Sequence, residues 1–323
     1  MEIKQIISEI KEKVEAVGGL KAVYFVACGG SQAAIYPAKY LLQSEAKNFA
    51  SENFTSNEFV HATPKSLDNR CICIICSLKA TAETVEAVKV TNAKGAITIA
   101  MTGFSDTEMA KEGQYVVIYS SGDNQVYSKA NQALALKIGF EILHQFEIYP
   151  NYDAAMAVYS RIDKIIAAAK VNLLPKAKEF AKKFKDDPII YVTASGPLYG
   201  TAYTMACCHL MEMQCKHAIA IHCGEYFHGP FETTDKDVPL ILLKSTGRTR
   251  PLDDRLETFL KKYGEHYIII DAEEVGLGQI NPNVSEFFNS IIMIPVERYF
   301  VYQMSLIRNH SMNYRRYMWK VEY

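Results

Sequence analysis

Two turns in the first half of the chain carry small and hydroxyl-bearing residues that suit an anion. They occur in the segments "CGGS" and "CSLKATAET", and the residues are Gly29, Gly30 and Ser31 in the first turn and Ser77, Thr81 and Thr84 in the second. Where a parallel strand gives way to a helix, backbone N–H groups and the positive helix end point to one spot, which suits phosphate. Glycines let the backbone approach the anion. Serine and threonine at a helix start are also ordinary caps, so each turn alone has this second interpretation.

A glutamate and a histidine in the second half of the chain are candidates for proton transfer. Glu212 lies in the apolar segment "LMEMQC", where an acid is costly to bury, so either a function or a paired structural acid explains it. His228, in "GEYFHGP", could titrate near neutral pH or could be a simple turn residue. Glu225 in the same segment could cap a turn or hold an arginine.

The eight cysteines indicate a reducing compartment rather than a metal site. Several lie inside apolar runs, where free thiols behave as small core residues. Cys73 and Cys76 form a CxxC, but it lies in the strand-like "CICIIC" without a second pair at zinc spacing. We therefore predict no metal and no other cofactor.

These candidates must be positioned by alternating strands and helices. In the first half, apolar runs predict strands at 22–27, 71–76, 96–101 and 115–120, and helical periodicity predicts helices over 33–44, 81–95 and 132–146. In the second half, the pattern predicts strands within 188–194, 217–222, 238–244, 267–271 and 291–295, and helices over 201–213, 252–264 and 298–310. Such alternation predicts an α/β fold with parallel sheets covered by helices on both faces.

The two halves repeat one another. "YFVACGGSQA" and "YVTASGPLYG" each end an apolar strand in a small-residue turn, and placing Cys28 on Ser195 and Gly29 on Gly196 gives an offset of 195 − 28 = 167 residues. A repeat at half length indicates duplicated domains. We expect the first domain at 1–160 and the second at 161–323.

Composition excludes several classes of partner. The 35 basic and 36 acidic residues leave a formal net charge of −1, so no overall field recruits nucleic acid or an anionic membrane. The N-terminal segment reads as an amphipathic helix without an apolar signal core, and no apolar run reaches the ~18 residues of a membrane span. We predict a cytoplasmic protein that binds neither nucleic acid nor membrane.

Together the two turns resemble the phosphosugar loops of the sugar isomerase (SIS) domain, which read C-G-T-S and S-x-S-G-x-T. "QVYSKA" at 125–130 resembles a later substrate-contacting segment of that family, and it supplies Val126 and Ser128. The resemblance implies two tandem SIS domains, each a flavodoxin-like parallel sheet sandwiched by helices. In the second turn Leu78 and Lys79 replace the serine and glycine of the family, so an ammonium stands where a glycine normally approaches phosphate.

The segment "LMEMQCKHAIAIHCGEYFHGPFE" is similar to the catalytic region of two-domain SIS enzymes, typified by the isomerase half of glucosamine-6-phosphate synthase. The similarity implies that Glu212 transfers a proton and that His228 opens the sugar ring, with Glu225 in the same loop binding substrate. His209 stands where the synthase has a lysine. The family also implies a homodimer in which the loop of His228 reaches into the partner's site. The second copy's phosphate loop, "STGRTR" at 245–250, is expected to be idle and solvated.

The C-terminal "NYRRYMWKVEY" places basic residues among aromatic ones at an end that would ordinarily fray. In two-copy SIS enzymes the tail folds over the sugar site, and Lys320 is the expected contact. This tail, with "NEFVHATP" and "GEYFHGP", resembles the fructoselysine and glucoselysine 6-phosphate deglycases. The resemblance implies cleavage of a 6-phosphorylated Amadori compound, a phosphorylated sugar-amine, to a hexose 6-phosphate and a free amino acid.

Two alternatives stay open from the sequence. An aldose–ketose phosphosugar isomerase or an aminosugar-phosphate deaminase would use the same glutamate with a different leaving group. A phosphosugar-sensing SIS regulator would need neither Glu212 nor His228, and such regulators usually carry a DNA-binding helix-turn-helix. The sequence does not name the released amine or the sugar epimer.

Overall fold

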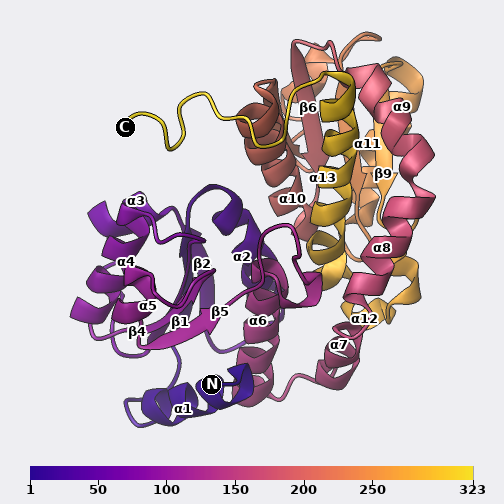
Figure 1. The fold of residues 1–323 in the computed structure, drawn as a ribbon. Coiled ribbons are helices and arrows are strands. Elements are labelled where there is room, and N and C mark those ends of the chain that lie inside the picture. The colour runs from indigo at the N-terminus through magenta and orange to yellow at the C-terminus, as the bar shows by residue number, and fades with distance from the viewer. Residues whose placement is uncertain (323) are drawn as a thin grey trace. The chain divides into compact units, whose positions relative to one another are not determined.

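The first half of the chain forms a five-stranded parallel sheet (Figure 1). Its strands are β1 (Ala22–Ala27), β2 (Ala50–Phe54), β3 (Cys71–Cys76), β4 (Ile97–Thr102) and β5 (Tyr115–Ile118). Their order is β2-β1-β3-β4-β5, and every neighbouring pair is parallel. This is the flavodoxin-like order, in which the direction of winding reverses between β1 and β3.

Helices cover both faces of this sheet. They are α1 (Ile3–Glu15), α2 (Gly29–Glu45), α3 (Ser56–His61), α4 (Ala82–Ala93), α5 (Glu108–Glu112), α6 (Asn131–Glu147) and α7 (Tyr152–Val158). α2 packs on α6, and α4 packs on both α3 and α5. Every residue of β1, β3 and β4 is buried, as expected for parallel strands covered on two faces.

The second half repeats this arrangement with a four-stranded parallel sheet. Its strands are β6 (Ile189–Ala194), β7 (His217–His222), β8 (Leu240–Lys244) and β9 (Tyr267–Asp271), in the order β7-β6-β8-β9. Its helices are α8 (Ile162–Asn172), α9 (Leu174–Phe184), α10 (Tyr199–Tyr203), a π-helix (Thr204–Glu212), α11 (Arg250–Tyr263), α12 (Pro282–Ser285) and α13 (Asn289–Ile307). The predicted α/β fold with two helix-covered parallel sheets is confirmed.

The local predictions failed at several places, three of which concern the sheets and the candidate site. The predicted strand at 291–295 is wrong, because these residues lie inside α13, where Ile291, Ile292 and Met293 are all buried. The edge strand β2 was not predicted, because its mostly polar sequence "ASENF" lacks an apolar signal. The predicted helix over 201–213 divides into α10 and a π-helical stretch of nine residues.

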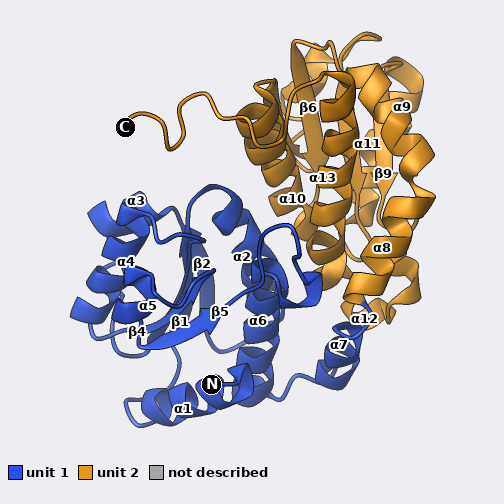
Figure 2. Cartoon of the chain, in the orientation of Figure 1, with its two compact units in different colours: residues 1–161 blue, residues 162–323 orange. Residues whose placement is uncertain are grey.

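The chain divides into two compact units, Met1–Arg161 and Ile162–Tyr323 (Figure 2). The computed structural model describes residues 1–322, and Tyr323, the last residue of the predicted second domain, lies outside the described residues. Among the helices formed by residues 1–322, none combines the length and the apolar character that crossing a lipid bilayer requires.

Candidate active site

The first small-residue turn of unit 1 lies at the reversal point of the sheet. β1 pairs with β3, and Ala27 is opposite Cys76, so the turns that follow these two strands leave the sheet side by side. Ligands of open α/β sheets bind at this point, beyond the carboxyl ends of the strands. The topology therefore brings the two predicted phosphate-binding turns together.

Gly29 leaves the start of α2 open. Its φ of +55° is left-handed, and a Cβ built on it would meet no atom within 4 Å. α2 begins at Gly29 and continues for 17 residues, and Gly30 is exposed beside it. Open space therefore lies beside Gly29 at the first turn of α2, where helix N–H groups without intrahelical partners favour an anion.

The second turn gathers hydroxyl groups. The Thr81 N–H donates to Ser77 Oγ at 3.1 Å, and the Thr81 and Thr84 hydroxyls are 3.0 Å apart. Thr84 also bonds Ser56 Oγ at 3.0 Å, a buried residue at the start of α3 that the sequence analysis did not identify. Thr81 is an exposed residue, whereas Ser77 and Thr84 are buried, so the cluster lies at the surface of the unit with two of its members fixed beneath it.

At the position of the family's glycine, this chain has Lys79. Lys79 is exposed, and the left-handed residue of this turn is its neighbour Ala80, at φ +54°. Glycine adopts this conformation without strain, whereas alanine does so at a cost. The turn thus keeps a glycine-type backbone without a glycine.

The segment with Val126 and Ser128 follows β5. The Val126 N–H donates to Ser120 Oγ at 2.9 Å, and Ser128 is half-buried in a short 3₁₀ helix that precedes α6. Because the segment leaves the carboxyl end of β5, it lies at the same sheet edge as the two turns.

The corresponding turn of unit 2 is filled. Gly196 has the same left-handed backbone, φ +50°, but a Cβ on it would lie within van der Waals overlap of the Thr249 hydroxyl, at 2.4 Å. Ser195 Oγ donates to the Thr249 carbonyl at 3.1 Å, and Gly196, Pro197 and Leu198 are all buried. A side chain therefore occupies the space that is open beside Gly29.

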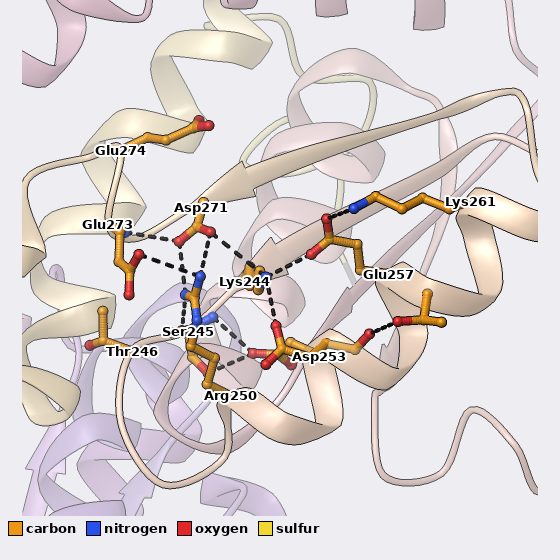
Figure 3. A network of polar contacts seen from close by, with 12 residues as sticks. Lys244, Ser245, Thr246, Arg250, Asp253, Glu257, Lys261, Asp271, Glu273 and Glu274 are labelled. Carbon is orange, nitrogen blue, oxygen red and sulfur yellow. Dashed lines mark hydrogen bonds and ion pairs between the residues drawn. The ribbon is translucent and has the colours of Figure 1, made fainter.

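The arginines of the 245–250 segment are engaged by carboxylates, and Figure 3 shows the network around Arg250. Arg250 forms a two-pronged ion pair with Asp271, at 2.9 and 2.7 Å, and Arg248 Nε lies 2.6 Å from Glu286. Ser245 is fully buried and donates its N–H and its hydroxyl to Asp253, at 2.8 and 2.6 Å. The segment was expected to be solvated; it is instead largely a structural network.

Glu212 ends the π-helix and faces a cavity. The cavity measures about 540 Å³ and is lined from the π-helix, the start of β7 and the C-terminal tail. Arg315 of the tail pairs with Glu212 at 2.7 Å, and its Nη1 also donates to the Met312 and Tyr314 carbonyls at 3.1 and 2.7 Å. The tail thus lies over the glutamate through Arg315, a partner that the sequence analysis did not assign to it. π-Helical stretches are frequent at functional sites.

Lys320, the tail residue that was expected to reach the sugar, lies beside Arg315. Its Nζ donates to the Arg315 carbonyl at 2.5 Å and lies 5.5 Å from the centre of the Tyr314 ring. Lys320 therefore supports the tail segment that carries Arg315.

His228 and Glu225 lie on an exposed turn after β7. The His228 N–H donates to the Glu225 carbonyl at 2.9 Å, and Gly229 follows at φ +134°. Phe227 anchors the turn through a cation–π contact, because the Arg255 guanidinium lies 4.1 Å from the centre of its ring. Both predicted side chains are thus presented to solvent from a fixed base.

Within unit 2, Glu212 and His228 lie at opposite ends of β7. The π-helix ends before the strand begins at His217, and the His228 turn comes after the strand ends at His222. A six-residue strand spans about 20 Å at about 3.3 Å per residue. Among the described residues, those that line the cavity of Glu212 include neither His228 nor Glu225.

His209 is a buried structural residue. Its Nδ1 lies 2.7 Å from Glu297 of α13, and the two are 4% and 0% exposed. Burial raises the pKa of Glu297, and the histidine opposes this rise. The residue that replaces the synthase lysine thus joins the π-helix to α13. Among residues 1–322, no cluster of three or more histidine, cysteine or acidic side chains could hold a metal ion.

Comparison with known proteins relates the whole chain to one family. The SIS domain model matches residues 20–140. The chain is 38% identical to "Fructosamine deglycase FrlB" of Bacillus subtilis (strain 168), over 100% of this chain and 97% of that protein. It is 26% identical to the fructoselysine 6-phosphate deglycase of Escherichia coli (strain K12), over 98% and 92%.

Solved structures agree with this relationship. A Salmonella typhimurium LT2 protein, provisionally assigned as a phosphosugar isomerase, superposes with a TM-score of 0.96 at 39% identity, over 99% of this chain and 96% of that one. The C-terminal domain of glucosamine-fructose-6-phosphate aminotransferase from Francisella tularensis shares the fold at a TM-score of 0.79 and 18% identity, over 96% and 93%. The predictions of an enzyme and of tandem SIS domains are confirmed, and the chain belongs to the SIS domain family.

Proposed function

We propose that this enzyme cleaves a 6-phosphorylated Amadori compound to a hexose 6-phosphate and a free amino acid. The observation that carries the proposal is Glu212, a carboxylate at a cavity of about 540 Å³, in a chain that resembles fructosamine deglycase along its full length. An aldose–ketose isomerase is the second candidate, because it needs the same carboxylate.

In the proposed reaction, the phosphate binds in unit 1. The open turn at Gly29 supplies backbone N–H groups, and the hydroxyl of the exposed residue Thr81 adds a donor from the neighbouring turn. Ser31, Val126 and Ser128 belong to segments at the same sheet edge. The filled turn at Gly196 supports an assignment of the phosphate to unit 1 alone.

The chemistry is proton transfer followed by hydrolysis. His228 protonates the ring oxygen and opens the sugar. Glu212 then takes a proton from C1, which carries the nitrogen, so that the C2 carbonyl becomes the hydroxyl of an enaminol. Return of a proton to C2, with loss of the N–H proton, gives an imine at C1, which water hydrolyses. Positioned acid–base groups typically contribute ~10²- to 10⁴-fold each.

The proposed site is shared between two copies of the chain. Glu212 and His228 of one chain lie at opposite ends of β7, so one chain does not place them together within unit 2. We therefore assign the proton-donating histidine of each site to the partner chain. A homodimer in the cytoplasm stays a prediction.

The test is product release from a panel of phosphorylated Amadori compounds. We expect hexose 6-phosphate and amino acid in equal amounts, and loss of more than nine-tenths of the turnover in Glu212→Gln. Glu265→Gln is the matched control, because Glu265 is an exposed glutamate in a surface ion pair with Lys236. Aldose–ketose interconversion without amine release would contradict the deglycase and favour the isomerase.

A further inference from the structure

The π-helix brings a cysteine onto the face of Glu212. Cys207 precedes Glu212 by five residues, the spacing that backbone hydrogen bonds join in a π-helix, whose turns are wider than those of an α-helix. In an α-helix, at 3.6 residues per turn, the same two side chains would point well apart. Both residues line the cavity of about 540 Å³.

The cavity carries an excess of positive charge. Arg315 is neutralised by Glu212 at 2.7 Å, whereas the Arg316 guanidinium interacts with the hydroxyl of Tyr314, a neutral group. The Lys216 ammonium, from another residue of the cavity wall, donates to the Asp187 carbonyl at 2.5 Å. A small anion is therefore favoured in the cavity over a neutral molecule of the same size.

Cys207 is the accessible member of a pair of adjacent thiols. It is half-buried, whereas Cys208 is 6% exposed. Interaction with the Cys208 thiol, aided by Tyr203, lowers the pKa of Cys207, although burial and Glu212 oppose the shift. The thiolate is the reactive form of cysteine, and a lowered pKa increases its share at neutral pH.

We propose that Cys207 is a modification site for small anionic carbon electrophiles and that its alkylation closes the cavity beside Glu212. With iodoacetate, the thiolate electron pair forms an S–C bond to the methylene carbon while the C–I bond breaks and iodide leaves. The adduct places a carboxymethyl group in the space next to the carboxylate. Closure of the active site rests on the proposed function; the alkylation itself does not.

The test of reactivity is competitive labelling of the full-length protein, followed by mass spectrometry of its peptides. We expect iodoacetate to modify Cys207 first, at least tenfold faster than Cys215, which lines the same cavity, or Cys28, which is half-buried in unit 1. The iodoacetate-to-iodoacetamide rate ratio should be at least threefold higher at Cys207 than at Cys28, and Arg316→Gln should reduce it. First labelling at Cys28 or Cys215, or equal ratios, would overturn the proposal.

The test of closure follows deglycase activity during labelling. Activity should fall in parallel with Cys207 modification in the wild type and in Cys215→Ser. Cys207→Ser, treated in the same way, should retain its own starting activity. Complete modification of Cys207 with activity unchanged would refute closure. Because labelling is read by mass alone, a wild-type protein without deglycase activity would contradict the proposed function and leave the reactivity result standing.

Discussion

At the scale of single residues, the pair of Arg315 and Glu212 is the feature with the clearest chemical consequence. Both side chains are largely removed from water, at 11% and 24% exposure, and the guanidinium also holds two tail carbonyls. Arg315 therefore fixes the carboxylate and the tail in one arrangement. A planar guanidinium does this through several donors at once, which an ammonium cannot reproduce.

We predict that Arg315→Ala lowers kcat at least tenfold with a smaller change in KM. Arg315→Lys should restore only part of the loss, because it returns the charge without the fork of donors. Arg316→Ala is the matched control, since it removes a cation from the same cavity without touching Glu212. Steady-state kinetics beside thermal melting decide the matter: a folded Arg315→Ala enzyme within twofold of wild-type kcat would show that the pair has no role in turnover.

A second residue-scale prediction concerns the pH dependence of Cys207 alkylation. Cys208 and Tyr203 lower the pKa of this thiol, while burial and Glu212 raise it, and the net direction is downward. Alkylation requires the thiolate, so its rate should fall as pH decreases, with a midpoint below the ~8.5 of an ordinary cysteine. The measurement is the iodoacetamide rate at Cys207 between pH 5 and pH 10; a midpoint at or above that of free cysteine would contradict it.

At the scale of elements, two equivalent glycines have opposite surroundings. A Cβ on Gly29 would meet open space, whereas a Cβ on Gly196 would lie 2.4 Å from the Thr249 hydroxyl. Both residues have positive φ, so alanine is strained by a comparable amount at each, roughly 1–2 kcal/mol. Only the second also forces a clash, which typically costs a further ~1–3 kcal/mol.

We therefore predict a crossed pattern for the two substitutions. Gly196→Ala should lower the melting temperature several degrees more than Gly29→Ala. Gly29→Ala should raise KM for the phosphorylated substrate more strongly, because its methyl group enters the proposed phosphate turn. The two variants control for one another in calorimetry and kinetics. A larger KM effect from Gly196→Ala would place the phosphate in unit 2.

Periodicity predicted most of the elements but did not distinguish the π-helix that lines the cavity. Buried runs such as "CICIIC" are strands because they are covered on both faces, and the pattern shows this. The π-helix has no distinct local signature, so the shared face of Cys207 and Glu212 could not be found from helical spacing. "IIMIP" has a strand-like composition, yet its buried position within α13 decides its conformation.

At the scale of the whole molecule, the two halves are copies of one fold that have diverged at the turn after their first strand. The two sheets share the order of their first four strands, and each places a left-handed glycine after the first of these in sequence. The half-length offset made this repeat predictable. Its divergence was not, because the Thr249 side chain that fills the second turn lies 53 residues from Gly196 in sequence (249 − 196) and meets it only in the folded unit.

Two copies of the chain are the remaining requirement of the proposed mechanism. Within one chain, Glu212 and His228 lie at opposite ends of the six-residue strand β7. His228 is exposed, and the neighbouring Phe227 anchors its turn. In a symmetric dimer with exchanged loops, each site would combine one chain's glutamate with the other chain's histidine. Either single substitution would then inactivate both sites of its own homodimer.

We predict that mixing Glu212→Gln with His228→Ala subunits restores activity. Random pairing makes about half of the dimers mixed, and one of the two sites in each holds both intact groups, so activity should approach about a quarter of wild type. The measurement is turnover after the two inactive proteins are unfolded and refolded together, with each refolded alone as control. Mass spectrometry of differently tagged chains verifies that mixed dimers form. If they form and stay inactive, both groups must come from one chain, and the arrangement of the proposed site across two subunits is wrong.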